Sequence, residues 1–97
     1  MGSVAARHAR AVLTGVERII AIELVVAAQA LDLRLGLASA EGEAARPGAG
    51  VAEALRRIRA RIAHLDRDRE PGPDLAAATA MVHDGLLEDL AGPGGLA

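Results

Sequence analysis

Apolar residues surround the first predicted helix instead of following one of its sides. At about 100° per residue, the polar residues of positions 3–34 fall on one stripe, and the rest of the circumference is apolar. Between Ile19 and Ala28 the stripe is interrupted. The pattern predicts a long helix over about 3–34, with Ser3 as its N-cap, that needs neighbours on nearly all sides. The polar stripe consists of Arg7, Arg10, Thr14, Glu17, Arg18, Gln29 and Asp32.

Two shorter helices are predicted after it. Apolar residues at the 4-3-4-3 spacing of one helical face favour a helix over about 51–65. A third is expected over about 74–84, with Asp74 as its N-cap and Gly85 as the residue that ends it. No segment alternates as a strand does, so the fold class is all-α. The predicted organisation is a long core helix over 1–35, a flexible loop over 36–50, a helical segment over 51–90 and a frayed tail over 91–97.

Glu23 stands in the middle of the apolar run, with no basic residue three or four positions away. A buried carboxylate without a partner costs several kcal/mol, so its partner must come from another helix or another subunit. Arg34 shares its helical face but lies eleven residues, about 16 Å, along the axis. Two interpretations stay open, an inter-helix contact and a buried network that supports a distant active site. We favour the structural one for Glu23, Arg18, Gln29 and Asp32.

The composition predicts a thin core. The chain has 97 residues and is 52% hydrophobic, yet it contains no Phe, Trp or Tyr. Alanine supplies much of the apolar content but buries little area, and no cysteine is present to crosslink the chain. The lack of cysteine fits a reducing, cytoplasmic setting. The charges within positions 11–31 argue against a membrane span.

Candidate chemistry is sparse. The net charge is −2, acidic residues flank the arginines of the second helix, and no aromatic side chain can stack on a base, which argues against nucleic-acid binding. The chain has no lysine, which excludes a phosphate-binding P-loop. His8, His64 and His83 lie in separate elements and are expected at the surface. We therefore predict no catalytic, cofactor-binding or metal-binding residue.

The stretch from Gly15 to Arg34 resembles a helix near the C-terminal end of the histidine ammonia-lyases and their relatives, the aromatic amino acid ammonia-lyases and aminomutases. The matching residues are Glu17, AIEL at 21–24, AAQ at 27–29 and LDLR at 31–34. Two weaker matches extend the resemblance over nearly the whole chain. They are Met1-Gly2-Ser3 with Ala5-Ala6-Arg7, and the turn DRDR at 66–69 with Pro73-Asp74 and Gly85.

The resemblance implies that the chain is the C-terminal part of a much longer enzyme. These enzymes are homotetramers whose long helices bundle at the centre, which would give Glu23 a partner and make residues 3–34 scaffold. Their electrophile is a methylidene-imidazolone formed from an internal Ala-Ser-Gly, whereas here Ala38-Ser39 is followed by Ala40. The family's catalytic tyrosine has no counterpart, and its active-site glutamate would fall before Met1.

We therefore expect part of a helical-bundle enzyme that removes ammonia from an L-amino acid to give an unsaturated acid. The chain alone is expected to have no cofactor and no activity, and its partners would be other subunits or a missing N-terminal lyase part. The alternatives are a free-standing helical oligomerisation module without activity, and completion of an enzyme in trans. The choice among histidine, phenylalanine and tyrosine is not encoded here, because the residues that line the family's substrate pocket lie elsewhere.

Overall fold

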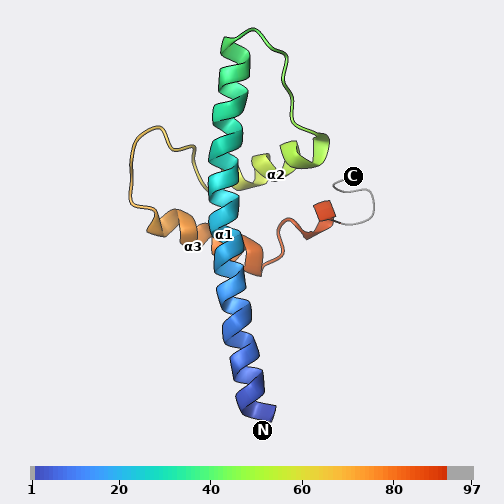
Figure 1. Cartoon of the computed structure of the whole chain (residues 1–97), viewed down its shortest axis with the longest axis vertical. Coiled ribbons are helices and arrows are strands. Elements are labelled where there is room, and N and C mark those ends of the chain that lie inside the picture. Colours follow the sequence, from blue (N-terminus) through green and yellow to red (C-terminus); the bar gives the residue numbers. More distant parts are fainter. Residues whose placement is uncertain (1, 92–97) are drawn as a thin grey trace.

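The computed structural model describes residues 2–91, which form three α-helices and a short 3-10 turn (Figure 1). The helices are α1 (Gly2–Ala40), α2 (Ala49–Arg59) and α3 (Gly72–His83), and the turn is η1 (Glu88–Ala91). Within these described residues there is no strand. The all-α fold class is confirmed. The predicted frayed tail lies, from residue 92 on, outside the described residues.

The long axis of the molecule is α1. Its 39 residues rise about 58 Å, close to the longest dimension of 61 Å. The other two helices cross the middle of α1, and the part of α1 nearest the N-terminus projects beyond both (Figure 1). Every residue from Gly2 to Val16 is exposed. About the first four turns of α1 therefore lie exposed outside the core.

The core is small and is built around two alanines of α1. Ala21 and Ala28 are seven residues apart and face the same way, and both are buried against α2 and α3. Their small side chains allow the larger ones of the other elements to approach α1 closely. No polar side chain is buried among the described residues. The thin core expected from the composition is confirmed; its remaining buried members are Ile58, Ile62, Ala78 and Met81.

The long helix extends beyond its predicted end at Arg34. Residues 36–40, which we expected in the flexible loop, are helical, and only 43–48 lack regular structure. Gly42 ends the helix with a φ of +80°. Its N–H donates to Ser39 O at 3.1 Å, and that of Glu43 donates to Ala38 O at 2.8 Å, the two bonds of a Schellman motif. The loop prediction was wrong for 36–40, because leucine and alanine outweigh the single Gly36 there.

The termini of the shorter helices also differ from the prediction. The second helix ends at Arg59 instead of Leu65, and the N–H of Leu65, which a helix to that residue would direct to Arg61 O, donates to Gln29 Oε1 instead. The third begins at Gly72, so Asp74 lies inside its first turn and is not the N-cap. Ser3 likewise lies within α1. Both capping predictions were wrong.

The predicted role of Gly85 is confirmed. It has a φ of +67°, and its N–H donates to Val82 O at 3.2 Å. The N–H of Leu86 donates to Met81 O at 3.1 Å, which completes a second Schellman motif at the end of α3.

We expect alanine substitutions of four glycines to act with opposite signs. Gly42→Ala and Gly85→Ala place a side chain at positive φ, so each should lower the free energy of unfolding by about 1 kcal/mol or more. Gly15→Ala and Gly36→Ala meet nothing within 4 Å inside a regular helix, so each should raise it by about 0.5–1 kcal/mol. Urea unfolding followed by circular dichroism measures all four. A stabilising Gly42→Ala would contradict the left-handed ending of α1.

Candidate functional site: a polar cluster beside an apolar groove

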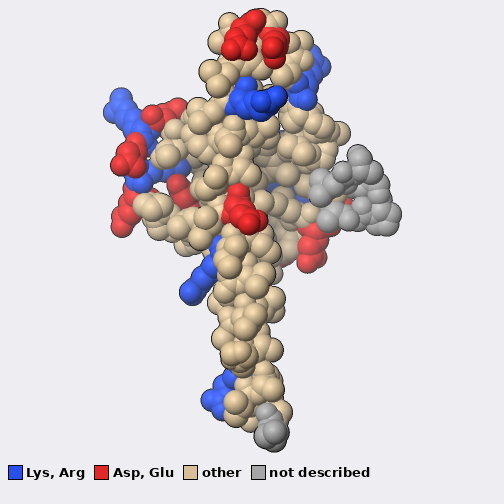
Figure 2. All heavy atoms as spheres, viewed as in Figure 1, with Lys and Arg blue, Asp and Glu red and all other residues tan. Residues whose placement is uncertain are grey.

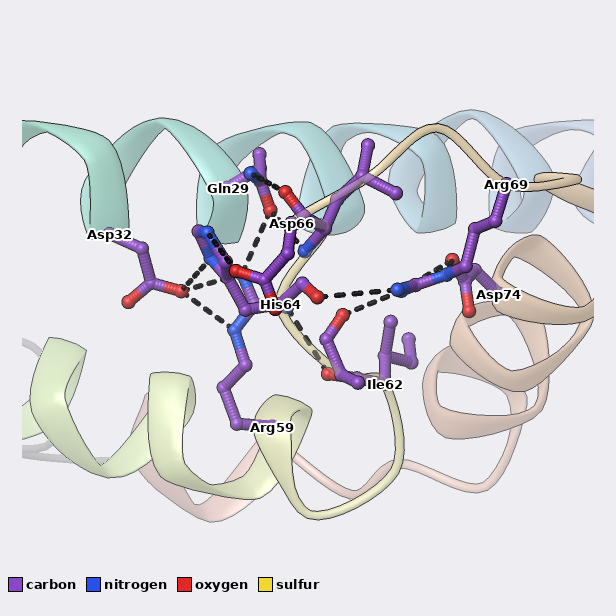
Figure 3. Close-up of polar contacts among 10 residues, drawn as sticks. Gln29, Asp32, Arg59, Ile62, His64, Asp66, Arg69 and Asp74 are labelled. Carbon is purple, nitrogen blue, oxygen red and sulfur yellow. Dashed lines mark hydrogen bonds and ion pairs between the residues drawn. The ribbon is translucent and has the colours of Figure 1, made fainter.

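A polar cluster connects α1 to the segment between α2 and α3 (Figure 3). Its side chains come from all three helices and from the connecting segment itself, and they surround the backbone of residues 62–65. It is the largest set of polar contacts between elements in the described part of the chain. The cluster consists of Gln29, Asp32, Arg59, His64, Arg69 and Asp74.

Gln29 binds the connecting segment with both ends of its amide. Leu65 N donates to Gln29 Oε1 at 3.0 Å, and Gln29 Nε2 donates to Leu65 O at 3.1 Å. One side chain thus satisfies both backbone groups of a residue 36 positions away. An amide suits this role because it carries a donor and an acceptor side by side.

Two arginines satisfy the three carbonyls before Leu65. Arg59 Nη1 donates to Ile62 O at 3.1 Å. Arg69 donates through Nη2 to Ala63 O at 2.6 Å and through Nη1 to His64 O at 3.2 Å. These three residues lie beyond the end of α2, so their carbonyls have no helical partner and need donors from elsewhere. With these donors in place the chain leaves the helix after Arg59.

The charges of the cluster pair with one another. Asp32 Oδ2 accepts from Arg59 Nε at 2.8 Å and lies 2.7 Å from Arg59 Nη2. His64 Nδ1 lies 3.2 Å from the same oxygen, and Arg69 Nη2 lies 2.9 Å from Asp74 Oδ2. Burial raises the pKa of Asp32, but the hydrogen bonds from Arg59 and His64 outweigh it and hold that pKa below its ordinary value. Asp32 is therefore an anion that pairs with Arg59 and His64 in the described chain.

A second set of ion pairs connects α2 to η1. Arg57 contacts Glu53 at 3.0 Å and Asp89 at 2.6 Å, and its Nη1 also donates to Leu86 O at 2.9 Å. Hydrogen bonds from Arg56 and Arg57 lower the pKa of Glu53 to about 2. Hydrogen bonds from Arg57 likewise lower the pKa of Asp89. These contacts fix the end of the described chain against α2.

Two apolar grooves lie on either side of α1. The first, about 370 Å³, lies beside the polar cluster, which supplies its polar border. The second, about 280 Å³, lies between α1, α2 and η1. The first is lined by Val25, Val26, Leu33, Ile62, Leu65 and Pro71, and the second by Leu24, Leu31, Val51, Leu55, Leu87 and Leu90.

The four predicted core residues of α1 have different surroundings. Gln29 and Asp32 join the polar cluster, whereas Arg18 is exposed at the border of a groove with Ile22 and Thr79. Glu23 is exposed and forms no ion pair with any described residue. The chain by itself does not bury this carboxylate, so its partner outside the chain stays a prediction.

Sequence reasoning missed Arg59, Arg69 and His64. The arginines of the second helix were interpreted as a solvated face, and His64 as a surface residue, yet its ring contacts Asp32. One sequence signal could have indicated the Arg69–Asp74 ion pair. Arg69 lies five residues before Asp74, in the predicted turn between two helices. His83 is exposed as expected and contacts Glu17 at 3.2 Å. Among the described residues, no three His, Asp or Glu side chains are placed to hold a metal ion.

The family model described as aromatic amino acid lyase matches residues 1–60, which is more than half of the chain. The chain belongs to the aromatic amino acid lyase family. The family match covers the whole of α1 and α2, and so includes Gln29, Asp32 and Arg59. The resemblance found in the sequence is thus confirmed.

The curated relatives are full-length lyases of which this chain resembles a small part. It is 47% identical over 88 residues to histidine ammonia-lyase of Anaeromyxobacter sp. (strain K), a match that covers 91% of the chain and 16% of the relative. It is 42% identical over 97 residues to that of Symbiobacterium thermophilum, with 96% of the chain and 18% of the relative covered. It is 39% identical over 87 residues to that of Myxococcus xanthus, with 90% and 16% covered.

No solved structure matches this lyase-family chain. The chain spans about a sixth of the length of the curated relatives it matches. Over the described residues 2–91, no helix has the length and apolarity that crossing a bilayer requires.

We expect Arg69→Met to loosen the connecting segment of this lyase-family chain. The variant removes the donors to Ala63 O and His64 O together with the ion pair to Asp74. Because two backbone acceptors and one carboxylate lose their partner, amide exchange over 62–66 should accelerate about tenfold or more. Arg67→Met is the matched control, since Arg67 is exposed and makes no described ion pair. Hydrogen exchange with mass spectrometry measures both variants. If amide exchange over 62–66 accelerates equally in both, Arg69 does not stabilise the connecting segment.

The acid dependence of stability should come from the paired carboxylates. The pKa values of Asp32, Glu53 and Asp89 are lowered in the folded chain, that of Glu53 to about 2. Their contribution is therefore complete above the unfolded values near 4 and is lost as pH falls through the lower folded values. The free energy of unfolding should stay level above about pH 5 and decline between about pH 4.5 and 2.

Asp32→Asn tests one source of this decline. The variant should be less stable at neutral pH and should lose less stability on acidification, because the ionised group is gone. Asp68→Asn, at an exposed position without a described ion pair, should retain the original profile. Urea titrations at several pH values give the comparison, and parallel curves for both variants would contradict the role of Asp32.

Proposed function

We propose that the chain is the C-terminal helical part of an ammonia-lyase, an enzyme that eliminates ammonia from an L-amino acid to give an unsaturated acid. The family match and the identity to histidine ammonia-lyases support this proposal. Within such an enzyme, α1 serves as scaffold for assembly, and the polar cluster fixes the elements around it. The lack of cysteine supports a cytoplasmic location.

The observation that carries the proposal is the apolar surface left open on α1. Ten large apolar side chains of this helix are at least 40% exposed. The projecting part of α1 is mostly uncharged over the face shown in Figure 2. A continuous surface of this kind marks a contact with another protein or another part of the same protein. The ten are Val4, Val12, Leu13, Val16, Ile19, Ile20, Ile22, Val26, Leu33 and Leu37.

The chain lacks the groups that would perform the elimination. The chain contains no Ala-Ser-Gly, from which the family's electrophile forms; Ala38-Ser39 is followed by Ala40, and the chain has no tyrosine. The three residues also lie in the last turn of α1, where their backbone is committed to helical and capping hydrogen bonds. We infer that the electrophile and the substrate pocket are supplied by the rest of the lyase or by other subunits.

A free-standing helical oligomerisation module is the second candidate. It is favoured by the hydrogen bonding of the described chain, whose buried side-chain polar atoms all have partners within the chain. No buried side-chain nitrogen or oxygen lacks a hydrogen-bond partner in residues 2–91. The described chain therefore leaves no buried side-chain polar atom for an outside partner to satisfy, as a module would require and a fragment would not.

The purified 97-residue chain should not turn over L-histidine, L-phenylalanine or L-tyrosine. The assay follows the absorbance of the conjugated unsaturated acid, with the full-length Myxococcus xanthus relative as the positive control. Adding the chain to that relative truncated before the matching segment should restore turnover. The free-standing module predicts no restoration, and turnover by the chain alone would refute the scaffold role.

A further inference from the structure

The chain beyond α3 turns at Gly85 and then lies beside α2 (Figure 1). We call residues 86–90 the strap. The turn requires glycine for two reasons, since its φ is +67° and a Cβ at this position would come within 2.8 Å of Glu88 Cδ. The strap is attached firmly at its first residue, because Leu86 packs against the core and its N–H donates to Met81 O at 3.1 Å.

Beyond Leu86 the strap has few bonds to other elements. The two backbone hydrogen bonds described there, at 3.2 and 3.1 Å, both stay within residues 85–90. Among the described residues, the polar contacts of this part of the strap with another element all come from Arg57 of α2. Arg57 Nη1 donates to Asp89 Oδ1 at 2.6 Å, and Nη2 donates to Asp89 Oδ2 at 3.0 Å. A bidentate pair of this kind fixes the orientation of both side chains.

Neighbouring groups hold Arg57 in the orientation that receives Asp89. Arg57 Nε donates to Glu53 Oε1 at 3.0 Å, one turn earlier on α2, and Arg57 Nη1 donates to Leu86 O at 2.9 Å. Glu53 in turn accepts two hydrogen bonds from Arg56, at 2.8 and 2.6 Å. Because the guanidinium is already oriented by α2, little of its side-chain freedom is lost when Asp89 binds.

The apolar contacts of the strap are incomplete. Leu87 and Leu90 line the second apolar groove together with Leu24, Leu31 and Leu55, and a volume of about 280 Å³ stays open between them. A space of this size holds several water molecules, so the side chains on its two sides do not gain full contact with one another. The position of the strap therefore depends on its ion pair more than on its leucines.

We propose that the strap is a lid on the second apolar groove, hinged at Gly85 and held closed by the ion pair between Arg57 and Asp89. When this pair breaks, residues 87–90 move away from α2 and the aliphatic side chains of the groove become accessible to solvent. The side chain of Asp89 is 66% exposed, so dissolved ions reach the pair and screen it. The strap thus makes the exposure of an apolar surface depend on ionic strength. This inference does not depend on the proposed function.

The rate at which a thiol in the groove is labelled measures the opening of the lid, because the chain has no cysteine of its own. Leu24→Cys places a thiol in the second groove, and Val25→Cys places one in the first groove, which the strap does not line. Adding Arg57→Met or Asp89→Asn should raise the labelling rate of the Leu24→Cys chain at least about threefold. The rate of the Val25→Cys chain should stay unchanged. Circular dichroism verifies that each variant is helical.

Charge-matched substitutions and salt complete the labelling experiment. Arg61→Met and Glu88→Gln remove exposed charges that form no described ion pair, so neither should change the labelling of the Leu24→Cys chain. Sodium chloride raised from about 0.05 M to about 1 M should increase that labelling about twofold or more, because the screening length shortens to about 3 Å. The same salt should have no such effect once Asp89→Asn is present.

Hydrogen exchange of the strap provides a second measurement without any cysteine. The amides of Glu88 and Leu90 should exchange at least about threefold faster in Arg57→Met and in Asp89→Asn, and the double variant should exchange no faster than either single one. Unchanged exchange and labelling in both single variants would overturn the proposal. An equal rise in labelling at Leu24→Cys and Val25→Cys would also overturn it, because the whole chain and not the strap would then have loosened.

Discussion

The size of the side chains at Ala21 and Ala28 governs how the other helices meet α1. A methyl group lets Ile58, Ile62 and Met81 pack directly against the helix, but it contributes little buried area of its own. The interior is accordingly shallow, and no disulfide or aromatic residue adds to it. Position and direction of the segment after α2 therefore depend on polar contacts. Gln29, Arg59 and Arg69 supply these contacts by satisfying the backbone groups of residues 62–65, which lie outside any helix.

The two sides of α1 thus differ in how far the rest of the chain covers them. One side carries the alanines, Gln29 and Asp32, and its partners are all present in the 97 residues. The other side carries large aliphatic residues and Glu23, and all of them stay exposed in the described chain. A family member that spans about a sixth of its relatives would be expected to show such a division. Under the proposed function, the covered side serves local folding and the open side serves assembly.

Periodicity and glycine chemistry were enough to predict three helices, their order and the end of α3 at Gly85. They failed where tertiary contacts compete with local preference. The spacing from Val51 to Leu65 is helical throughout, yet α2 stops at Arg59, and the N–H of Leu65 donates to the distant Gln29 instead of to Arg61 O. The polar cluster could not be predicted for the same reason. Gln29 and Leu65 are 36 positions apart, and no sequence pattern near either residue indicates that they pair. Gly42 was a local signal that could have placed the end of α1, since it has the same role as Gly85.

The projecting start of α1 has a consequence for the order in which the molecule forms. From Gly2 to Val16 every residue is exposed, and a stretch of this length is only marginally helical in water on its own propensity. The helical structure of this N-terminal arm is therefore expected to depend on another surface that covers it. The centre of α1 would become ordered first, with the alanine contacts, and the N-terminal arm would gain its full helicity only on docking. Part of the free energy of that docking is then consumed in ordering the arm, which weakens the association and makes it reversible.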